Sequence, residues 1–194
     1  MERQRWLDGT LYSPDFEQDS CGFGLIAQID NQPSHTLVQN AIGSLACMTH
    51  RGAIAADGLS GDGCGLLFKK PDAFLRAVAA EAGFTLGGLY AAGLLFLSRE
   101  APPQAHARST LKTQLEAQGL TVAGFRHVPT DASVCGESAL ASLPHIEQVF
   151  VNAPAGMSED DFERKLYIGR RLAEKALEPT DPVFYLPTLS CRVI

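Results

Sequence analysis

The sequence predicts a fold that mixes α-helices with β-strands, and three observations support this. Short apolar runs with the length of buried strands alternate with longer stretches whose apolar residues recur at helical spacing. The 194 residues suffice for one large domain or two small ones with a sizeable core. No internal repeat, low-complexity tract or linker-like segment interrupts them. Taken alone, the alternation favours a parallel α/β fold.

The composition is typical of a globular protein, with 45% hydrophobic and 20% charged residues. A formal net charge of −6 disfavours non-specific nucleic-acid binding, which depends on basic patches. The longest apolar run, residues 86–97, is shorter than the roughly 20 residues that a membrane-spanning helix needs. We therefore expect neither a nucleic acid nor a membrane as a partner.

The amino terminus and the cysteines predict a cytoplasmic protein. Residues 1–20 are polar, contain no apolar segment of a signal peptide, and are interpreted as a leader. The five cysteines are widely spaced and include no CxxC pair, which argues against a disulfide framework and a zinc ribbon. They are Cys21, Cys47, Cys64, Cys135 and Cys191.

The first third of the chain is predicted to contain two strands and a helix. The apolar run 23–29 has the length and content of a buried strand. Ser34 is a suitable N-cap for a helix over about 35–49, where apolar residues fall at helical spacing. The glycine-rich residues 52–62 predict a loop, and residues 63–68 predict a second strand.

The rest of the chain is predicted to alternate helices and strands more regularly. Pro102 and Pro103 open a helix that stops at Gly119, because proline suits a first helical turn and glycine a C-terminal end. The clearest helix follows Ser158, with acidic residues in its first turn and basic residues later, as the helix dipole favours. The expected helices are 72–82, 102–118 and 159–177, with one turn at 137–142, and the expected strands are 89–98, 121–127, 145–151, 183–186 and 188–194.

Two clusters contain the residues best suited to chemistry. In the first, Asp19-Ser20-Cys21-Gly22-Phe23-Gly24, the cysteine stands at the start of the expected strand, and the glycines let a ligand approach the backbone closely. By itself this hexapeptide is more typical of a packed core cysteine. The second cluster, about thirty residues later, comprises His50-Arg51-Gly52-Ala53, Asp57-Gly58 and Gly61-Asp62-Gly63-Cys64-Gly65.

Together these motifs resemble the amino-terminal, class II glutamine amidotransferase domain of the glutamate synthase large subunit. Cys-Gly-x-Gly, a helix ending in His-Arg-Gly, and Gly-Asp-Gly-x-Gly occur in the family's order and at family-like spacing. Pro71-Asp72-Ala73-Phe74-Leu75 and Gln148-Val149-Phe150-Val151 extend the likeness over essentially the whole chain. The resemblance implies an α+β fold, part of the four-layer αββα sandwich of Ntn hydrolases, in place of a parallel sheet.

The resemblance also implies how the chain is organised. Residues 1–20 would be a leader that the protein removes itself, and residues 21–194 the amino-terminal part of an amidotransferase domain that continues further. The apolar ending Cys191-Arg192-Val193-Ile194 supports this expectation, because it would otherwise leave an unpaired strand edge.

Cys21 is the predicted catalytic nucleophile. A thiol needs a base to form a thiolate near neutral pH, and the α-amine of a chain terminus can be that base. Cleavage of the Ser20–Cys21 bond, which the resemblance implies, would place both groups in one residue. The thiolate would attack the side-chain amide of L-glutamine, release ammonia, and leave a thioester that water hydrolyses to glutamate.

Arg51 is the second predicted catalytic residue, since the resemblance places it beside the nucleophile, which it orients. Without the resemblance, an arginine that offsets the dipole at a helix end is an equally good interpretation. His50 is less favoured as a base because the terminal amine already fills that role. Gly61-Asp62-Gly63 lacks the ending of a phosphate-binding loop and is interpreted as a turn into a strand, with Cys64 as a core thiol of that strand. No metal spacing is seen among His35, His106, His127 and His145.

The substrate-binding residues of the family lie downstream of the matched segment, so they remain unknown in this chain. The family stabilises the oxyanion with an Asn-Gly pair, whereas none of Asn31, Asn40 and Asn152 precedes glycine. Loss of one oxyanion donor costs roughly 3 kcal/mol. We therefore expect little or no glutaminase activity from this chain alone.

The cofactors and partners follow from the resemblance only. This segment is expected to hold no cofactor, while FMN and an iron–sulfur cluster are implied for the rest of an NADPH-type parent enzyme. There, ammonia would reach a distant flavin site and convert 2-oxoglutarate to glutamate. The implied partners are L-glutamine, the remainder of the large subunit and the small electron-transfer subunit.

Three alternatives remain open. The chain could be a non-catalytic Ntn-like module for assembly or regulation that keeps its leader. It could also act on a different substrate, as a relative of the phosphoribosylpyrophosphate amidotransferases would. A thiol redox protein is disfavoured because no CxxC pair is present.

Overall fold

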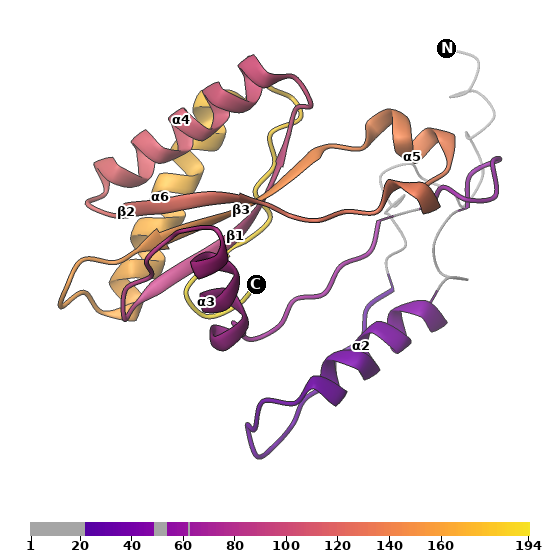
Figure 1. Cartoon of the computed structure of the whole chain (residues 1–194), viewed down its shortest axis with the longest axis horizontal. Helices are drawn as coiled ribbons and strands as arrows, with labels where there is room; N and C mark the ends of the chain where they lie inside the picture. The colour runs from indigo at the N-terminus through magenta and orange to yellow at the C-terminus, as the bar shows by residue number, and fades with distance from the viewer. Residues whose placement is uncertain (1–21, 49–53, 62) are drawn as a thin grey trace, which may run out of the picture. The chain divides into compact units, whose positions relative to one another are not determined.

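The computed structural model describes residues 22–48, 54–61 and 63–194. The chain divides into two compact units, which we call unit 1 (Met1–Leu66) and unit 2 (Leu67–Ile194). Unit 2 contains the β-sheet and most of the helices, whereas unit 1 contains helix α2 (His35–Cys47) and a short hairpin (Figure 1). In the described part of the chain, no helix is both long enough and apolar enough to span a membrane.

Unit 2 is built on a four-stranded antiparallel sheet in the order β2-β3-β1-β4. Its strands are β1 (Tyr90–Leu97), β2 (Thr121–His127), β3 (His145–Asn152) and β4 (Leu189–Ser190). The parallel sheet that alternation alone favoured is therefore wrong. β1 and β2 do run in the same direction, but β3 lies between them and is antiparallel to both. Helix 101–117 connects β1 to β2, and the chain then returns as β3, which pairs with both strands.

One face of the sheet is covered by two long helices, α4 (Ala101–Ala117) and α6 (Glu159–Leu177), as Figure 1 shows. Successive side chains of a strand point to opposite faces, so alternate residues of β1 face these helices. Ala91, Leu95 and Leu97 are fully buried there, against leucines that both helices contribute. This cluster is the larger of the two hydrophobic cores of unit 2.

The opposite face is covered in part by α3 (Asp72–Glu81), whose apolar side packs on Tyr90 and Phe150. The buried Tyr90 ring also joins the chain before α3 to the sheet. Lys70 Nζ lies 3.8 Å from the centre of the ring and donates a hydrogen bond to the Tyr90 carbonyl at 3.0 Å. The Arg76 guanidinium lies 4.7 Å from the same ring. Burial lowers the pKa of the Lys70 ammonium and raises that of the Tyr90 phenol.

The ends of the helices agree with the capping residues that the sequence offers. Ser158 Oγ accepts the Asp161 backbone N–H at 3.2 Å, and α6 spans the predicted residues. α4 gives way to Gly119, which adopts a φ of 76° that suits glycine. The predicted helical turn is α5 (Glu137–Ser142), preceded by a 3₁₀ turn, η3 (Ala132–Val134). These features depend on local chemistry, which explains why the sequence predicts them well.

The last predicted strands are only partly formed. Tyr185 exchanges two backbone hydrogen bonds with Phe96, at 2.8 and 3.0 Å, yet regular pairing resumes only at the two-residue β4. The register shifts by one residue between these points, and the Thr188 carbonyl lies where a Cβ on Gly93 would be. Gly93 therefore lets the irregular segment pass close to β1. Further on, Ile194 exchanges two backbone hydrogen bonds with Phe68.

The strands predicted over residues 23–29 and 63–68 are wrong. Residues 22–28 have no regular secondary structure and residues 29–30 form a turn, and residues 63–68 likewise form no strand. A strand exists only through hydrogen bonds to a neighbouring strand, and none of the described residues pairs with the run 22–28. The predicted helix of unit 1 is confirmed as α2, with Ser34 Oγ accepting the Leu37 N–H at 3.2 Å.

The architecture is of the α+β class. One antiparallel sheet, with the α4 and α6 layer on one side and α3 on the other, accounts for unit 2 (Figure 1). A sheet with its outer helical layer is half of an αββα sandwich. The described residues contribute this one sheet, in keeping with the partial sandwich expected from the sequence.

Candidate active site

The two predicted catalytic residues, Cys21 and Arg51, lie outside the described residues. The same holds for the leader 1–20, for His50 and for Asp62 of the Gly-Asp-Gly turn. The structure does describe the segments that follow each predicted residue. The local geometry around the candidate site is therefore built from the residues after Cys21, from α2, and from the hairpin after Arg51.

The segment after Cys21 is extended and apolar. Phe23 is 91% exposed and Leu25 is 87% exposed, so this run contributes nothing to a core in the described part of the chain. It ends in a turn in which the Asn31 N–H donates to the Gln28 carbonyl at 3.2 Å. Asn31 has a φ of 54°, a left-handed conformation that asparagine tolerates better than most residues.

Helix α2 brings the chain from this turn to the predicted His50-Arg51 pair. It starts at the Ser34 cap and ends at Cys47, and the Met48 N–H donates to the Leu45 carbonyl at 3.0 Å. None of the residues of α2 is buried. The helix is therefore held by its cap and its own backbone bonds, and it ends just before the predicted catalytic arginine, as the sequence indicates.

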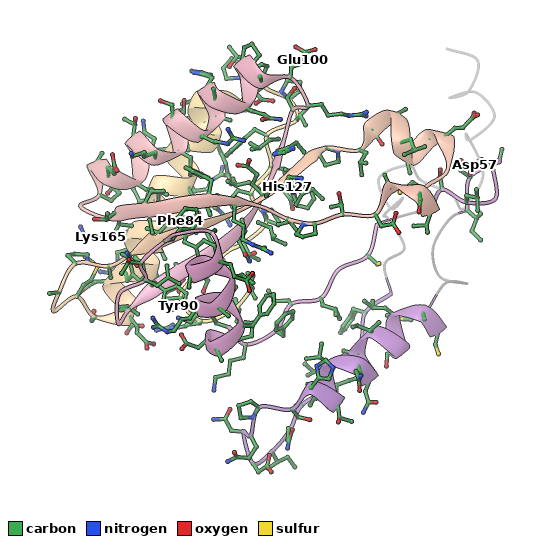
Figure 2. All side chains as sticks on the ribbon, in the orientation of Figure 1. Asp57, Phe84, Tyr90, Glu100, His127 and Lys165 are labelled. Atoms are coloured by element: carbon green, nitrogen blue, oxygen red, sulfur yellow. The ribbon has the colours of Figure 1, made fainter. Side chains whose placement is uncertain are left out.

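The residues after Arg51 form a hairpin, which we call the Asp57 hairpin (residues 54–61). Its ends meet in an isolated antiparallel bridge between Ile54 and Gly61. The Ala55 N–H donates to the Ser60 carbonyl at 2.8 Å, which closes the hairpin. The loop predicted over residues 52–62 is thus confirmed for its described part, and Figure 2 labels the Asp57 side chain within it.

The described thiols differ sharply in their surroundings. Cys64 is exposed and lies outside any strand, so the prediction of a strand-core thiol is wrong. Cys47 is also exposed, and Cys135 is half-buried. Cys191 is buried, and its burial together with the Glu163 carboxylate raises the pKa of its thiol to about 12. A thiol with that pKa is protonated at neutral pH, so Cys191 is no nucleophile.

Unit 2 holds a buried charged cluster that the sequence analysis missed. The Glu147 carboxylate accepts a hydrogen bond from Arg108 Nε at 2.7 Å and lies 3.0 Å from His145 Nε2. The sequence interpretation left His127 and His145 on separate segments, but the structure brings their rings to 4.9 Å (Figure 2 labels His127). The detectable sign was Glu147 itself, a carboxylate at an inward position of a strand otherwise rich in apolar residues.

The cluster around Glu147 is structural. Burial raises the pKa of the Glu147 carboxyl, but hydrogen bonds from Arg108 and His145 outweigh this and hold it below its ordinary value. The carboxylate therefore stays charged and joins α4 to the start of β3. Within the described ranges, no group of three His, Cys, Asp or Glu residues is arranged to hold a metal ion.

Comparison with known proteins gives the chain its context. Residues 21–194 match the family described as class-II glutamine amidotransferases. The chain is 38% identical over 184 residues to ferredoxin-dependent glutamate synthase 2 of Synechocystis sp., a match that covers 92% of the chain and 11% of that protein. It is also 38% identical over 186 residues to the glutamate synthase (NADPH) large chain of Azospirillum brasilense, covering 94% of the chain and 12% of the relative. The chain thus spans about a ninth of the length of these relatives.

Proposed function

Since the chain belongs to the class II glutamine amidotransferases, we propose that it supplies the nucleophile, Cys21, of a site that releases ammonia from L-glutamine in a longer protein. Its fold, a four-stranded antiparallel sheet flanked by helices, is that of a partial Ntn-hydrolase amidotransferase domain. The observation that carries the proposal is the family match over residues 21–194, whose first residue is the cysteine singled out from the motif. The relatives named as glutamate synthases add that the ammonia serves glutamate formation.

The proposed mechanism needs a new amino terminus at Cys21. Removal of residues 1–20 frees an α-amine, which takes the thiol proton and creates the thiolate. The sulfur attacks the side-chain carbonyl carbon of glutamine, and the tetrahedral intermediate expels ammonia with a proton returned from the amine. Water then cleaves the γ-glutamyl thioester, which releases glutamate and regenerates the thiol.

Arg51 is proposed to orient the nucleophile. Its place in the chain supports this, because α2 ends at Cys47 and the Asp57 hairpin begins at Ile54, so position 51 lies between two locally ordered elements. The helix-dipole interpretation remains the alternative for this arginine.

For the whole enzyme, we propose transfer of the ammonia to a second site, where 2-oxoglutarate becomes glutamate. FMN and an iron–sulfur cluster would serve that site in the remainder of the large subunit, with a small subunit to deliver electrons. The relatives bear both ferredoxin and NADPH names at similar identity, so NADPH as the electron donor stays a prediction, as does the cytoplasmic location.

The test is mass analysis of the full-length large chain that carries this domain, before and after treatment with an electrophilic diazoketone analogue of L-glutamine. We expect a chain that begins at Cys21 and gains one adduct, located on the Cys21 thiol. A Cys21→Ala variant should retain residues 1–20 and gain no adduct. A wild-type chain that keeps Met1 and stays unlabelled would instead favour the non-catalytic module with a retained leader.

A further inference from the structure

We propose that Asp57 is a positioning residue for the Cys21 reaction and acts by fixing the hairpin that immediately follows Arg51. The inference rests on the proposed function and adds to it a residue outside the predicted catalytic pair. Asp57 need not touch glutamine. Its carboxylate organises the backbone of residues 54–61, which follow the predicted catalytic arginine closely in the sequence.

The Asp57 carboxylate is the centre of the hairpin's hydrogen bonds. Its Oδ1 accepts the backbone N–H groups of Leu59 at 3.0 Å and Ser60 at 2.8 Å. Its Oδ2 accepts the Ser60 hydroxyl at 2.6 Å. Behind it, the Gly58 N–H donates to the Ala55 carbonyl at 3.0 Å, with Gly58 at a φ of 68°. One side chain thus supplies three of the bonds that hold the turn.

The described residues of unit 1 provide the hairpin with no hydrophobic core. Ile54 and Leu59 are exposed, whereas Ser60 is only 6% exposed. Ser60 is the single buried residue among the described residues of unit 1. Loss of the Asp57 carboxylate would therefore remove three hydrogen bonds from the turn, including this acceptor of a buried hydroxyl.

The hairpin connects the two halves of the sequence motif. Ile54 follows Arg51 by three residues, so covalent geometry keeps position 51 within about 11 Å of the base of the hairpin. Gly61, at the other side of that base, leads directly into the Gly-Asp-Gly run. A closed hairpin fixes the relative positions of Ile54 and Gly61, the two described residues nearest the predicted motif residues. Displacement of a catalytic group by about 1 Å can cost two orders of magnitude in rate.

The experiment compares Asp57→Ala, Asp57→Asn and wild type in the full-length large chain that carries this domain. We expect Asp57→Ala to lower kcat for glutamine hydrolysis, and the rate of adduct formation at Cys21, by about tenfold or more, with KM for glutamine changed less than twofold. Asp57→Asn should remain within threefold of wild type, because the asparagine carbonyl can still accept both backbone N–H groups.

The chain offers a matched control in Asp131. Its Oδ1 accepts the Ser133 N–H at 2.9 Å and the Ser133 hydroxyl at 2.6 Å, in an exposed turn of unit 2. Asp131→Ala removes the same kind of turn and should leave the adduct rate within twofold of wild type. Equal rates for Asp57→Ala and Asp131→Ala would overturn the proposal. Equal losses in Asp57→Asn and Asp57→Ala would overturn it too, since they would indicate a direct role for the charge.

Two further measurements keep the outcome unambiguous. Should Asp57→Ala unfold, Ser60→Ala replaces it. This variant removes the hydroxyl that donates to Asp57 Oδ2 and must still slow adduct formation relative to Asp131→Ala, whereas in Asp57→Asn the side-chain amide can still donate to that hydroxyl. Should wild-type protein gain no adduct at Cys21, the proposed function fails and takes this inference with it. An adduct in wild type with no effect of any Asp57 or Ser60 variant rejects the positioning role alone.

Discussion

Different interactions stabilise the described parts of unit 1 and unit 2. Unit 2 buries two hydrophobic clusters on the faces of its sheet, and its helices are fixed by long-range packing. In the described part of unit 1, only Ser60 is buried, and order comes from a helix cap and an aspartate turn. The predicted catalytic residues belong to unit 1, whereas the hydrophobic burial that stabilises the described chain is in unit 2.

This difference has a consequence for how the two units respond to change. A cooperative core makes each buried residue of unit 2 matter for global unfolding. Local hydrogen bonds among the described residues of unit 1 can be lost with little effect on that transition, because none of the buried residues described in this unit is apolar. Stability measurements therefore report on unit 2, and local probes are required for unit 1.

The largest expected effect on the free energy of unfolding distinguishes a buried phenylalanine of unit 2 from an exposed phenylalanine of unit 1. Phe150→Ala, which empties a fully buried position of the sheet, should lower the free energy of unfolding by about 3–5 kcal/mol. Phe23→Ala, at a side chain that is 91% exposed, should change it by less than about 0.5 kcal/mol. Urea unfolding followed by circular dichroism tests this, and similar losses in both variants would remove the distinction between the units.

The next effect concerns charge pairs inside unit 2. Arg108→Ala leaves the buried Glu147 carboxylate without its main donor and should cost about 2 kcal/mol of unfolding free energy. Lys112→Ala removes an exposed partner of Glu116 on the same helix and should cost less than about 0.5 kcal/mol. The same urea titration distinguishes them, and an Arg108→Ala loss no larger than the Lys112→Ala loss would show that burial of Glu147 is unimportant.

The third effect is the pH dependence that follows from Glu147. Its pKa is lower in the folded chain than in an unfolded one, so folding favours the ionised carboxylate. This contribution is fully present above the unfolded pKa of about 4.3 and is lost as the pH falls through the lower folded value. Thermal unfolding at pH 7 and below pH 4 should show a steeper loss for wild type than for Glu147→Gln. Parallel pH profiles would assign the acid loss to other groups.

The smallest effect compares two serine caps, each of which accepts the backbone N–H three residues later at 3.2 Å. Ser158→Ala, at the start of α6 in the packed helical layer, should lower the global unfolding free energy by about 1 kcal/mol. Ser34→Ala, at the start of the exposed α2, should leave global unfolding unchanged and speed amide hydrogen exchange within α2 alone. A global loss in Ser34→Ala equal to that in Ser158→Ala would indicate that the units unfold together.

Much of unit 2 could be predicted from the sequence because its elements carry local instructions. Helix 159–177 and strand 121–127 occur at the predicted residues, since a cap, a dipole-matched charge pattern and a bounded apolar run are readable without a neighbour. The strands expected at 23–29 and 63–68 did not form, because the same apolar composition becomes a strand only beside a partner.

The candidate site divides in the same way. Cys21 and Arg51 were selected from a motif, and they stay predictions because both lie outside the described residues. The roles of Glu147 and Asp57 came from the structure. Glu147 becomes significant only when Arg108, 39 residues away, reaches it, and Asp57 only when a turn directs two backbone amides at one oxygen.

By itself, the sequence predicted the ends of the long helices to within one or two residues and the family to which the chain belongs, and it gave the reason to propose Cys21 as the nucleophile. These depend on residue type and short spacing, which are properties of neighbours along the chain. Tertiary structure alone decided that the sheet is antiparallel with β3 inserted between β1 and β2, which face each helix covers, and which carboxylate is buried. The physical reason is that backbone pairing and burial arise from contacts between distant residues, and the free energy of those contacts is set by the partner as much as by the residue.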